Sequence, residues 1–374
     1  MLSRLIRVSL FILGFAIAGS AVAPREVAAQ SDILLRLRSG SPAGDRFRID
    51  SAGGVVSIGQ LGIGIIPATG CGYRMMWYPY KGAFRAGSPG SCPGAATQWD
   101  DANMGFYSWA GGNQTTASAF GTFAFGDGTT VSGTDAAGFG SSNTVSGTAG
   151  FATGASNRCT GFGCVTMGFT NTASGQGSVA IGYRVTADAD YAVAIGHRAS
   201  ANGHSGSFNI ADESTTDSLE ASANNQFNAR YAGGYRLYTN ATTTVGVALA
   251  AGGNSWSAIS DRNMKTDVKL VNNEDILKRI RAIPVATWRF KDRDAGKYVH
   301  IGPMAQDFQK AFPLKGADDK SINMYDLDGV NLAGVRALEE RTRNMQSELD
   351  AKSKKIESLE ARLAKLEALL AQKK

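Results

Sequence analysis

The chain has 374 residues and a formal net charge of +6, so it is long enough for two or three domains and only mildly basic. Its 46 glycines against 9 prolines are too many for an ordinary globular enzyme, and they lack the every-third-residue spacing of collagen. The C-terminal lysines are interspersed with glutamates at helical spacing, which favours a solvated coiled coil and argues against a nucleic-acid partner.

Residues 1–29 have the pattern of a secretory signal peptide. Arg4 and Arg7 precede an apolar run over residues 8–23, and the small residues at 27–29 favour a cut ahead of Gln30. The alternative is a retained N-terminal membrane anchor, for which the apolar run is short. We therefore predict an exported protein, extracellular, at the cell surface or periplasmic, with no transmembrane anchor after removal of the signal.

Residues 30–105 are predicted to form an N-terminal β region. Residues 33–38 and 55–58 alternate like short strands, and the aromatic stretch at 73–79 is interpreted as part of a cap rather than as a surface-binding module. Cys71 and Cys92 bracket a Pro/Gly-rich loop, and Cys159 and Cys164 are close neighbours. Export permits disulfides within these two pairs, and four buried free thiols are the open alternative.

A period of fourteen residues runs through the head segment, residues 106–208. Such a unit is too short for a helix pair and suits one solenoid coil of two short strands and two turns. A recurring glycine would supply positive φ or close backbone approach at one turn, while alanine and valine would fill a narrow interior. Because that interior is thin, several chains are expected to pack together. The glycine column comprises Gly112, Gly126, Gly140, Gly154, Gly168, Gly182 and Gly196; a second column comprises Ala117, Val131, Val145, Cys159, Ala173, Ala187 and Ala201; a third comprises Trp109, Phe123, Ala137, Phe151, Val165, Val179 and Val193.

The last two units read Val179-Ala180-Ile181-Gly182 and Val193-Ala194-Ile195-Gly196. This V-A-I-G pattern, followed by a small-residue half-coil, resembles the head repeats of trimeric autotransporter adhesins. The resemblance implies a mainly β fold, a left-handed parallel β-roll solenoid whose three chains trimerise side by side.

Residues 209–256 are predicted to be a β connector. Strand-like pieces occur near 227–231, 235–238 and 245–249. Gly233-Gly234 is expected to form a tight hairpin between the first two.

Near the start of residues 257–345 lie Ser260 and Lys265, which are five residues apart. Alone, that spacing is a weak signal, because Ser-Asp before a polar turn is commonly a helix cap or a turn. The pair, however, follows the glycine-rich repeats and precedes both the run H-I-G-P-M-A-Q at 300–306 and a heptad helix. In this order the features resemble the C-terminal intramolecular chaperone domain of endosialidases and phage tail fibres, a small α+β domain and self-cleaving serine peptidase.

The resemblance implies that Ser260 is the nucleophile, that Lys265 is its base, and that the cut falls between Ile259 and Ser260. The chain would act once on its own backbone, as an autocatalytic serine endopeptidase without an external substrate. A lysine is a base only where desolvation or a nearby positive charge favours its free amine, and in the family cleavage follows folding of a trimer. Asp261 either orients Lys265 or caps the turn; His300 is interpreted as a structural hydrogen-bonding residue rather than a third member of the site.

No cofactor and no metal are predicted. The chain has no phosphate-loop motif of the form G-x-x-x-x-G-K-[ST], and no Cys/His spacing matches a zinc site. The run Asp326-Leu327-Asp328-Gly329 begins like a calcium loop but lacks the remaining ligands. We interpret it as a turn that caps a helix beginning near Val330.

Heptads over residues 335–374 predict a C-terminal coiled coil and therefore self-association. The heptads do not fix the number of chains, and the trimer is implied by the family resemblance. Positions a are Val335, Thr342, Leu349, Ile356, Leu363 and Leu370, and positions d are Leu338, Met345, Lys352, Leu359, Leu366 and Lys373.

These features predict an exported homotrimeric fibre or adhesin-like surface protein whose C-terminal domain aligns three chains and then cleaves itself off at Ser260. One alternative is a structural trimer that is never cut and keeps a C-terminal stalk. Another is a polysaccharide-binding tailspike, which would need paired carboxylates on the solenoid. A host-surface or polysaccharide ligand of the head is left open. The acidic residues within 110–210 are sparse, namely Asp127, Asp135, Asp188 and Asp190.

Overall fold

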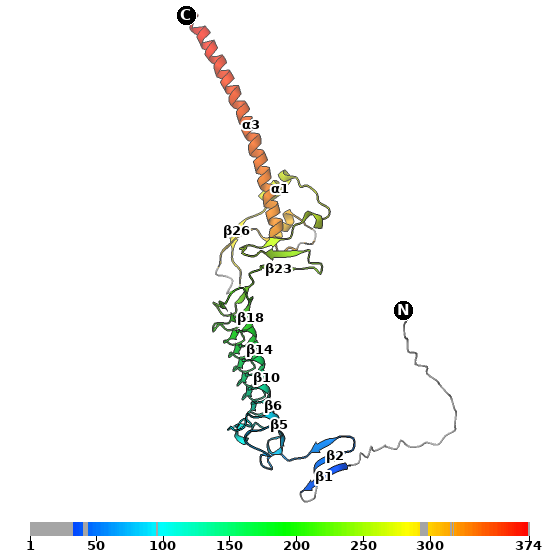
Figure 1. The fold of residues 1–374 in the computed structure, drawn as a ribbon. Coiled ribbons are helices and arrows are strands. Elements are labelled where there is room, and N and C mark those ends of the chain that lie inside the picture. Colours follow the sequence, from blue (N-terminus) through cyan, green and yellow to red (C-terminus); the bar gives the residue numbers. More distant parts are fainter. Residues whose placement is uncertain are drawn as a thin grey trace, which may run out of the picture. The chain divides into compact units, whose positions relative to one another are not determined.

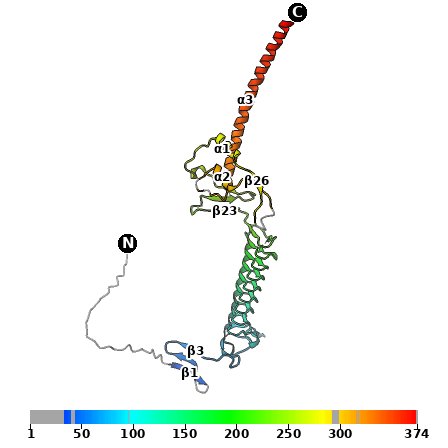
Figure 2. The ribbon, with the colours of Figure 1, turned by 180° about the vertical axis from the view of Figure 1, so that it is seen from behind.

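A computed structural model describes residues 33–39, 44–94, 96–291, 298–314, 316 and 318–372. The chain divides into two compact units, Met1–Ala232 and Gly233–Lys374 (Figures 1 and 2). The predicted signal peptide, residues 1–29, lies outside the described residues. Within the described ranges no helix combines the length and the apolar character that a membrane span requires.

The first unit begins with a three-stranded antiparallel sheet of β1 (Ile33–Ser39), β2 (Gly44–Asp50) and β3 (Val55–Ser57). Two short 3-10 helices, η1 (Pro79–Lys81) and η2 (Asp101–Asn103), lie further along the chain. An antiparallel pair, β4 (Arg74–Tyr78) and β5 (Ala83–Ser88), joins the end of the solenoid's larger sheet. Met76 and Tyr78 of β4 are buried in the same core as the solenoid alanines, so this pair covers one end of the interior.

Each solenoid coil contributes one long and one short strand (Figure 1). The long strands stack in parallel in an 11-stranded sheet, and the short strands form an 8-stranded sheet, which confirms the predicted β-solenoid. The long strands are β6 (Trp109–Asn113), β8 (Phe123–Asp127), β10 (Ala137–Ser141), β12 (Phe151–Ala155), β14 (Val165–Phe169), β16 (Val179–Tyr183) and β18 (Val193–His197). The short strands are β7 (Thr116–Ala117), β9 (Thr130–Val131), β11 (Thr144–Val145), β13 (Arg158–Cys159), β15 (Thr172–Ala173), β17 (Thr186–Ala187) and β19 (Ala199–Ser200).

The fourteen-residue period is also the pairing register of the long strands. Gly168 pairs with Gly182, and Val179 pairs with Val193. The second sequence column, Ala117 to Ala201, is fully buried, which confirms that small residues fill the interior. The third column, Trp109 to Val193, instead lies partly exposed on the outer face of the long-strand sheet, because its residues alternate with the buried alanines of each strand.

The glycine column marks one place where the backbones of successive coils approach each other closely. Gly182 has φ of +133° and Gly196 has φ of +98°, a region in which glycine is favoured. A Cβ atom on Gly182 would lie 2.0 Å from the carbonyl oxygen of Gly196. The column is therefore required both by backbone conformation and by contact between neighbouring backbones.

Buried asparagines reinforce three of the turns that follow these close approaches, namely those after Gly140, Gly154 and Gly168. Asn157 Nδ2 donates to the carbonyl oxygens of Thr153 and Gly168, and Asn157 Oδ1 accepts from the backbone nitrogen of Asn171. Asn143 and Asn171 repeat the pattern. Such a ladder satisfies backbone groups inside the narrow core. These asparagines stand at the same fourteen-residue spacing in the sequence, but they were not among the predicted columns.

Both candidate cysteine pairs are disulfides. Cys71 is bonded to Cys92 and Cys159 to Cys164, with Cα–Cα distances of 5.5 and 5.6 Å, within the ordinary range. The part of the chain that the structure describes contains no free cysteine. The alternative of free thiols is therefore wrong.

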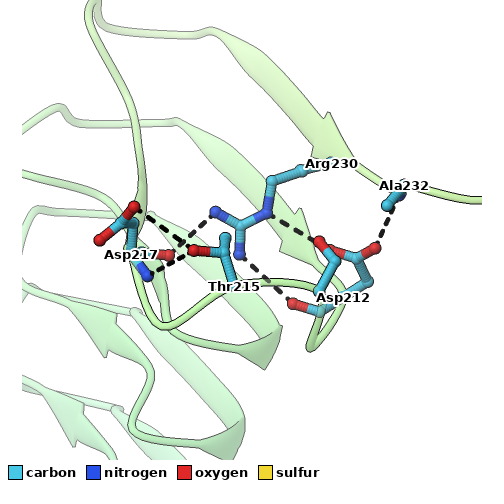
Figure 3. Close-up of polar contacts among 6 residues, drawn as sticks. Asp212, Thr215, Asp217, Arg230 and Ala232 are labelled. Carbon is cyan, nitrogen blue, oxygen red and sulfur yellow. Dashed lines mark hydrogen bonds and ion pairs between the residues drawn. The ribbon is translucent and has the colours of Figure 1, made fainter. Parts of the chain in front are cut away.

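The fourteen-residue register ends after β18. The next strands, β20 (Phe208–Ala211), β21 (Leu219–Glu220) and β22 (Phe227–Arg230), follow longer connections. Figure 3 shows the contacts that hold the loop after β20. Arg230 Nε donates to Asp212 Oδ1 at 3.3 Å and Arg230 Nη1 to the carbonyl of Asp217 at 2.9 Å, while Asp212 Oδ2 accepts from the backbone nitrogen of Ala232. This cluster closes the last coil with charge-assisted hydrogen bonds.

The second unit starts with a small antiparallel sheet. Its strands are β23 (Tyr235–Tyr238), β24 (Gly246–Leu249) and β25 (Ser257–Ala258). The predicted hairpin at Gly233-Gly234 is wrong, because β22 pairs with β20 in the solenoid sheet, whereas β23 pairs with β24. Hydrogen-bonded pairing with the preceding coil outweighs the local turn signal.

A short 3-10 helix, three α-helices and a two-stranded sheet complete the described part of this unit (Figure 2). They are η3 (Arg262–Met264), α1 (Asn273–Arg281), β26 (Ala286–Trp288), β27 (His300–Gly302), α2 (Ala305–Ala311) and α3 (Met324–Ala371). The expected turn at 326–329 is wrong, because these residues lie inside α3. The cap is Asn323, whose side chain accepts from the backbone nitrogen of Tyr325, a standard way to satisfy a free helical N–H group.

Candidate self-cleavage site

Ser260 lies two residues beyond the end of β25. Pairing of β25 with β24 fixes the backbone just before it. The backbone nitrogen of Ile259 donates to the carbonyl oxygen of Gly246 at 3.2 Å, which continues the pairing of β25 with β24. The residue on the amino side of the predicted cut is thereby fixed to a neighbouring strand. Ser260 itself lies just past this anchor and is exposed.

A short 3-10 turn brings Lys265 back to Ser260. Asp261 is the N-cap of η3, and its Oδ1 accepts from the backbone nitrogen of Asn263 at 2.9 Å. The turn closes through a hydrogen bond from Lys265 N to the carbonyl of Arg262. As a result, Lys265 Nζ donates to Ser260 Oγ at 2.5 Å. Of the two roles considered for Asp261, the structure shows the capping contact.

Tyr325 is a third member of this cluster, and sequence reasoning missed it. Its hydroxyl is hydrogen-bonded to Ser260 Oγ across 65 positions of sequence, and Lys265 Nζ lies 5.5 Å from the centre of its ring. The hydrogen bond with Ser260, and then the charge of Lys265, lower the pKa of the Tyr325 phenol. No motif links the two segments, because the contact exists only once α3 is folded.

His300 lies in an aromatic cluster. It pairs with Trp288 across β26 and β27, and the two rings stack with centroids 4.5 Å apart. Phe290 meets the imidazole edge-on at 5.7 Å. These contacts fit a packing role. The structure shows packing for this residue, and its predicted role in hydrogen bonding stays a prediction.

The surroundings of the Ser260 cluster are open in the single chain. Ser260, Lys265 and Tyr325 are all exposed. Tyr325 also borders an apolar groove of about 310 Å³, which includes Val271 and Phe312. Among the described residues, no group of three or more His, Cys, Asp or Glu side chains could hold a metal ion. The functional groups that meet at this site are a hydroxyl, an amine and a phenol.

Residues 260–316 match the protein-family model described as the chaperone of endosialidase. The match begins at Ser260 itself and ends before Tyr325. The chain therefore carries a chaperone-of-endosialidase domain after a β-solenoid, the architecture of endosialidase-like and tail-fibre-like proteins. No curated protein and no solved structure matches the chain.

Helix α1 packs against α3 and is joined to it by an ion pair. Arg341 Nη2 contacts Glu274 Oε2 at 2.5 Å, and Arg341 Nε donates to Glu274 Oε1 at 2.8 Å. Near the same interface, Gly334 of α3 leaves room for the side chain of Ile280. These contacts help fix the helix that carries Tyr325.

This ion pair predicts a small pH dependence. The hydrogen bond from Arg341, with its charge, lowers the pKa of the Glu274 carboxyl, so ionised Glu274 stabilises the folded state above the ordinary glutamate pKa. That contribution is lost as the pH falls through the lowered folded value. Melting temperatures of wild type and Glu274→Gln should therefore differ near neutral pH and converge in acid. Because the pair is exposed, the difference should be modest.

A matched control is Glu348→Gln, whose carboxylate is 3.9 Å from Lys352 in an exposed pair on α3. This variant should melt closer to wild type near neutral pH. A constant difference between Glu274→Gln and wild type across the whole pH range would contradict the assigned role of the charge.

Proposed function

We propose that the protein is an exported homotrimeric fibre or adhesin-like surface protein whose C-terminal domain is an intramolecular chaperone that cleaves itself off. The observation that carries the cleavage is the contact between Lys265 Nζ and Ser260 Oγ, at the first residue of the matched domain. In this proposal the head spans residues 106–208, the connector 209–256, the chaperone 257–345 and the coiled coil 335–374. Residues 1–29 act as the export signal.

The proposed reaction is an acyl shift followed by hydrolysis. Lys265, as the free amine, takes the hydroxyl proton of Ser260, and Oγ attacks the carbonyl carbon of Ile259. The C–N bond breaks, the nitrogen of Ser260 takes a proton from Lys265, and an ester joins Ile259 to Oγ. Water then hydrolyses the ester, which leaves a carboxylate on Ile259 and an amino terminus on Ser260.

Assembly supplies what a single chain lacks for this chemistry. Lys265 is exposed to water in the single chain, whereas the proposed proton transfer needs its free amine. Covering it with neighbouring chains would remove water and favour the free amine. Cleavage would then follow trimer formation, and the cut would happen once.

Two apolar surfaces support self-association. The outer face of the long-strand sheet carries a run of contacting aromatic rings, including Trp109, Phe123 and Phe139, and Trp109 is 47% exposed. On α3, the heptad residues Leu349 and Leu363 are 57% and 56% exposed. Contiguous apolar surface of this kind marks a protein interface. Chains packed side by side along the solenoid and wound together along α3 would bury both surfaces.

The chaperone role follows from the repeat. Because successive coils are nearly equivalent, neighbouring chains can pair in the wrong register. Bringing separate chains together in the correct register also costs entropy. A coiled coil holds the C-terminal ends together and raises the effective concentration of the heads. Once stacked coils bury their outer faces against one another, moving them out of register requires global unfolding.

A chain that ends at Ile259 tests this role. We expect it to give aggregated or misassembled head, whereas the full-length chain gives a trimer that survives release of residues 260–374. Light scattering and limited proteolysis distinguish the two products. The Ser260→Ala chain is the control, since it keeps the chaperone attached and should assemble as wild type does. A chain ending at Ile259 that forms a normal trimer by itself would refute the chaperone role, even if the cut is real.

A further inference from the structure

We propose that Tyr325 is a positioning residue that couples the reactivity of Ser260 to the folding of α3. This role rests on the proposed self-cleavage and adds to it a way to delay the cut until α3 has folded. Tyr325 lies outside the residues matched to the chaperone family, in the first turn of the helix that carries the heptads.

The helix cap fixes the backbone of Tyr325. Asn323 Oδ1 accepts from the backbone nitrogen of Tyr325 at 2.9 Å, and α3 begins at Met324. Tyr325 therefore has its observed direction only when the first turn of α3 is formed. From there its hydroxyl reaches Ser260 Oγ.

Two partners then hold the nucleophile. Ser260 Oγ receives a hydrogen bond from Lys265 Nζ and shares a second one with Tyr325 Oη. A serine side chain has three staggered rotamers, and this pair of contacts selects one of them. A phenol can donate or accept a hydrogen bond, so the Tyr325 hydroxyl can accept a hydrogen bond from the Ser260 hydroxyl while Lys265 is charged. It can donate to Oγ when Lys265 is the free amine and the serine proton points to Nζ.

Folding of α3 depends in turn on other copies of the chain. The helix spans Met324–Ala371, and its heptad residues are exposed in a single chain. An isolated helix gains most of its stability from packing of its apolar face. The contact between Tyr325 and Ser260 therefore links assembly of the coiled coil to the cleavage site. Early cleavage, before the chains are in register, would be slow.

The test measures the first-order rate of cleavage in full-length protein after refolding, by gel densitometry. Tyr325→Phe removes only the hydroxyl, and we expect a tenfold to hundredfold slower cut, about the effect of losing one hydrogen bond to a charged site. Tyr298→Phe is the matched control, because Tyr298 is an exposed tyrosine of the same unit, and it should cleave at the wild-type rate. Light scattering should report the same oligomer for all three proteins.

A second set of variants separates positioning from general destabilisation. Asn323→Ala should slow the cut about fivefold by weakening the cap, and Asn323→Asp, which also caps, should restore the rate. In the Tyr325→Phe background, Asn323→Ala should have little further effect, because both act through the same hydroxyl. Asn272→Ala removes the equivalent cap of α1 and should leave the cleavage rate near wild type.

Each outcome decides between the two proposals. If wild type is cut, Ser260→Ala is not, and Tyr325→Phe is cut at the wild-type rate, the coupling is refuted and the Ser260–Lys265 pair stands. Fully additive slowing by Asn323→Ala and Tyr325→Phe also refutes the coupling. If wild type is never cut, or if Ser260→Ala is cut as fast as wild type, the cleavage proposal fails and the coupling fails with it.

Discussion

Ser260→Ala and Lys265→Ala are both expected to remain full length, whereas wild-type protein yields a C-terminal fragment of residues 260–374. Ser260→Ala removes the oxygen that attacks Ile259, and Lys265→Ala removes the amine 2.5 Å from that oxygen. Loss of a nucleophile or its base lowers such a reaction by many orders of magnitude, so the expected result is one band against two. Intact mass and amino-terminal sequencing of the fragment check the position of the cut.

Neighbouring residues of the same types serve as controls. Ser257→Ala lies in β25, and Lys269→Ala lies four residues beyond Lys265; both side chains are exposed. Both variants should be cut like wild type. All four variants should still assemble, as light scattering would show. Fragment release by Ser260→Ala at the wild-type rate would show that the nucleophile has been assigned to the wrong residue.

Gly182→Ala is expected to destabilise the solenoid strongly. A methyl group at this position would lie 2.0 Å from the carbonyl oxygen of Gly196, so two coils must separate, and φ of +133° is unfavourable for any other residue. We expect the free energy of unfolding to fall by about 3 kcal/mol or more, the range for strain combined with overpacking. Guanidinium or thermal unfolding followed by circular dichroism measures it.

Gly163→Ala is the matched control, in a different column of the same repeat. Gly163 also has positive φ, +64°, but an added Cβ would meet nothing within 4 Å. Fourteen residues earlier, Ala149 occupies the equivalent position with φ of +55°. This variant should cost only about 1 kcal/mol, the ordinary penalty of the left-handed region. Equal losses for the two variants would mean that close approach between coils is not what the glycine column provides.

The solenoid was the most predictable part of the fold. Its columns repeat every fourteen residues, so each coil meets neighbours with the same pattern, and spacing in sequence translates directly into register in space. The glycine column lies at the predicted close approach between coils, and the alanine-rich column lies in the predicted interior. Spacing alone did not tell whether the side chains of the third column point into the solenoid or outward. The period shows that Phe123 and Val179 are equivalent, but it does not show which face of the strand they occupy.

The elements around Ser260 were predictable only in part. The five-residue spacing of Ser260 and Lys265 indicated a self-cleavage site only in combination with the run at 300–306 and the heptads. The start of α3 was predicted too late, because Asp326 and Gly329 carry turn signals that the Asn323 cap and the packing of the helix override. The hairpin expected at 233–234 is wrong for a similar reason, since β22 pairs with β20 in the solenoid sheet and not with β23.

The sequence by itself determined the period, the small-residue interior and the proximity of Ser260 and Lys265, because each depends on residues that are close along the chain or related by a fixed repeat. The tertiary structure decided that the hydroxyl of Tyr325 reaches Ser260 and that His300 stacks on Trp288. The hydroxyl contact joins groups 65 positions apart, and the stacking joins strands on either side of a loop. Such contacts form only when separate elements pack, so no local pattern encodes them.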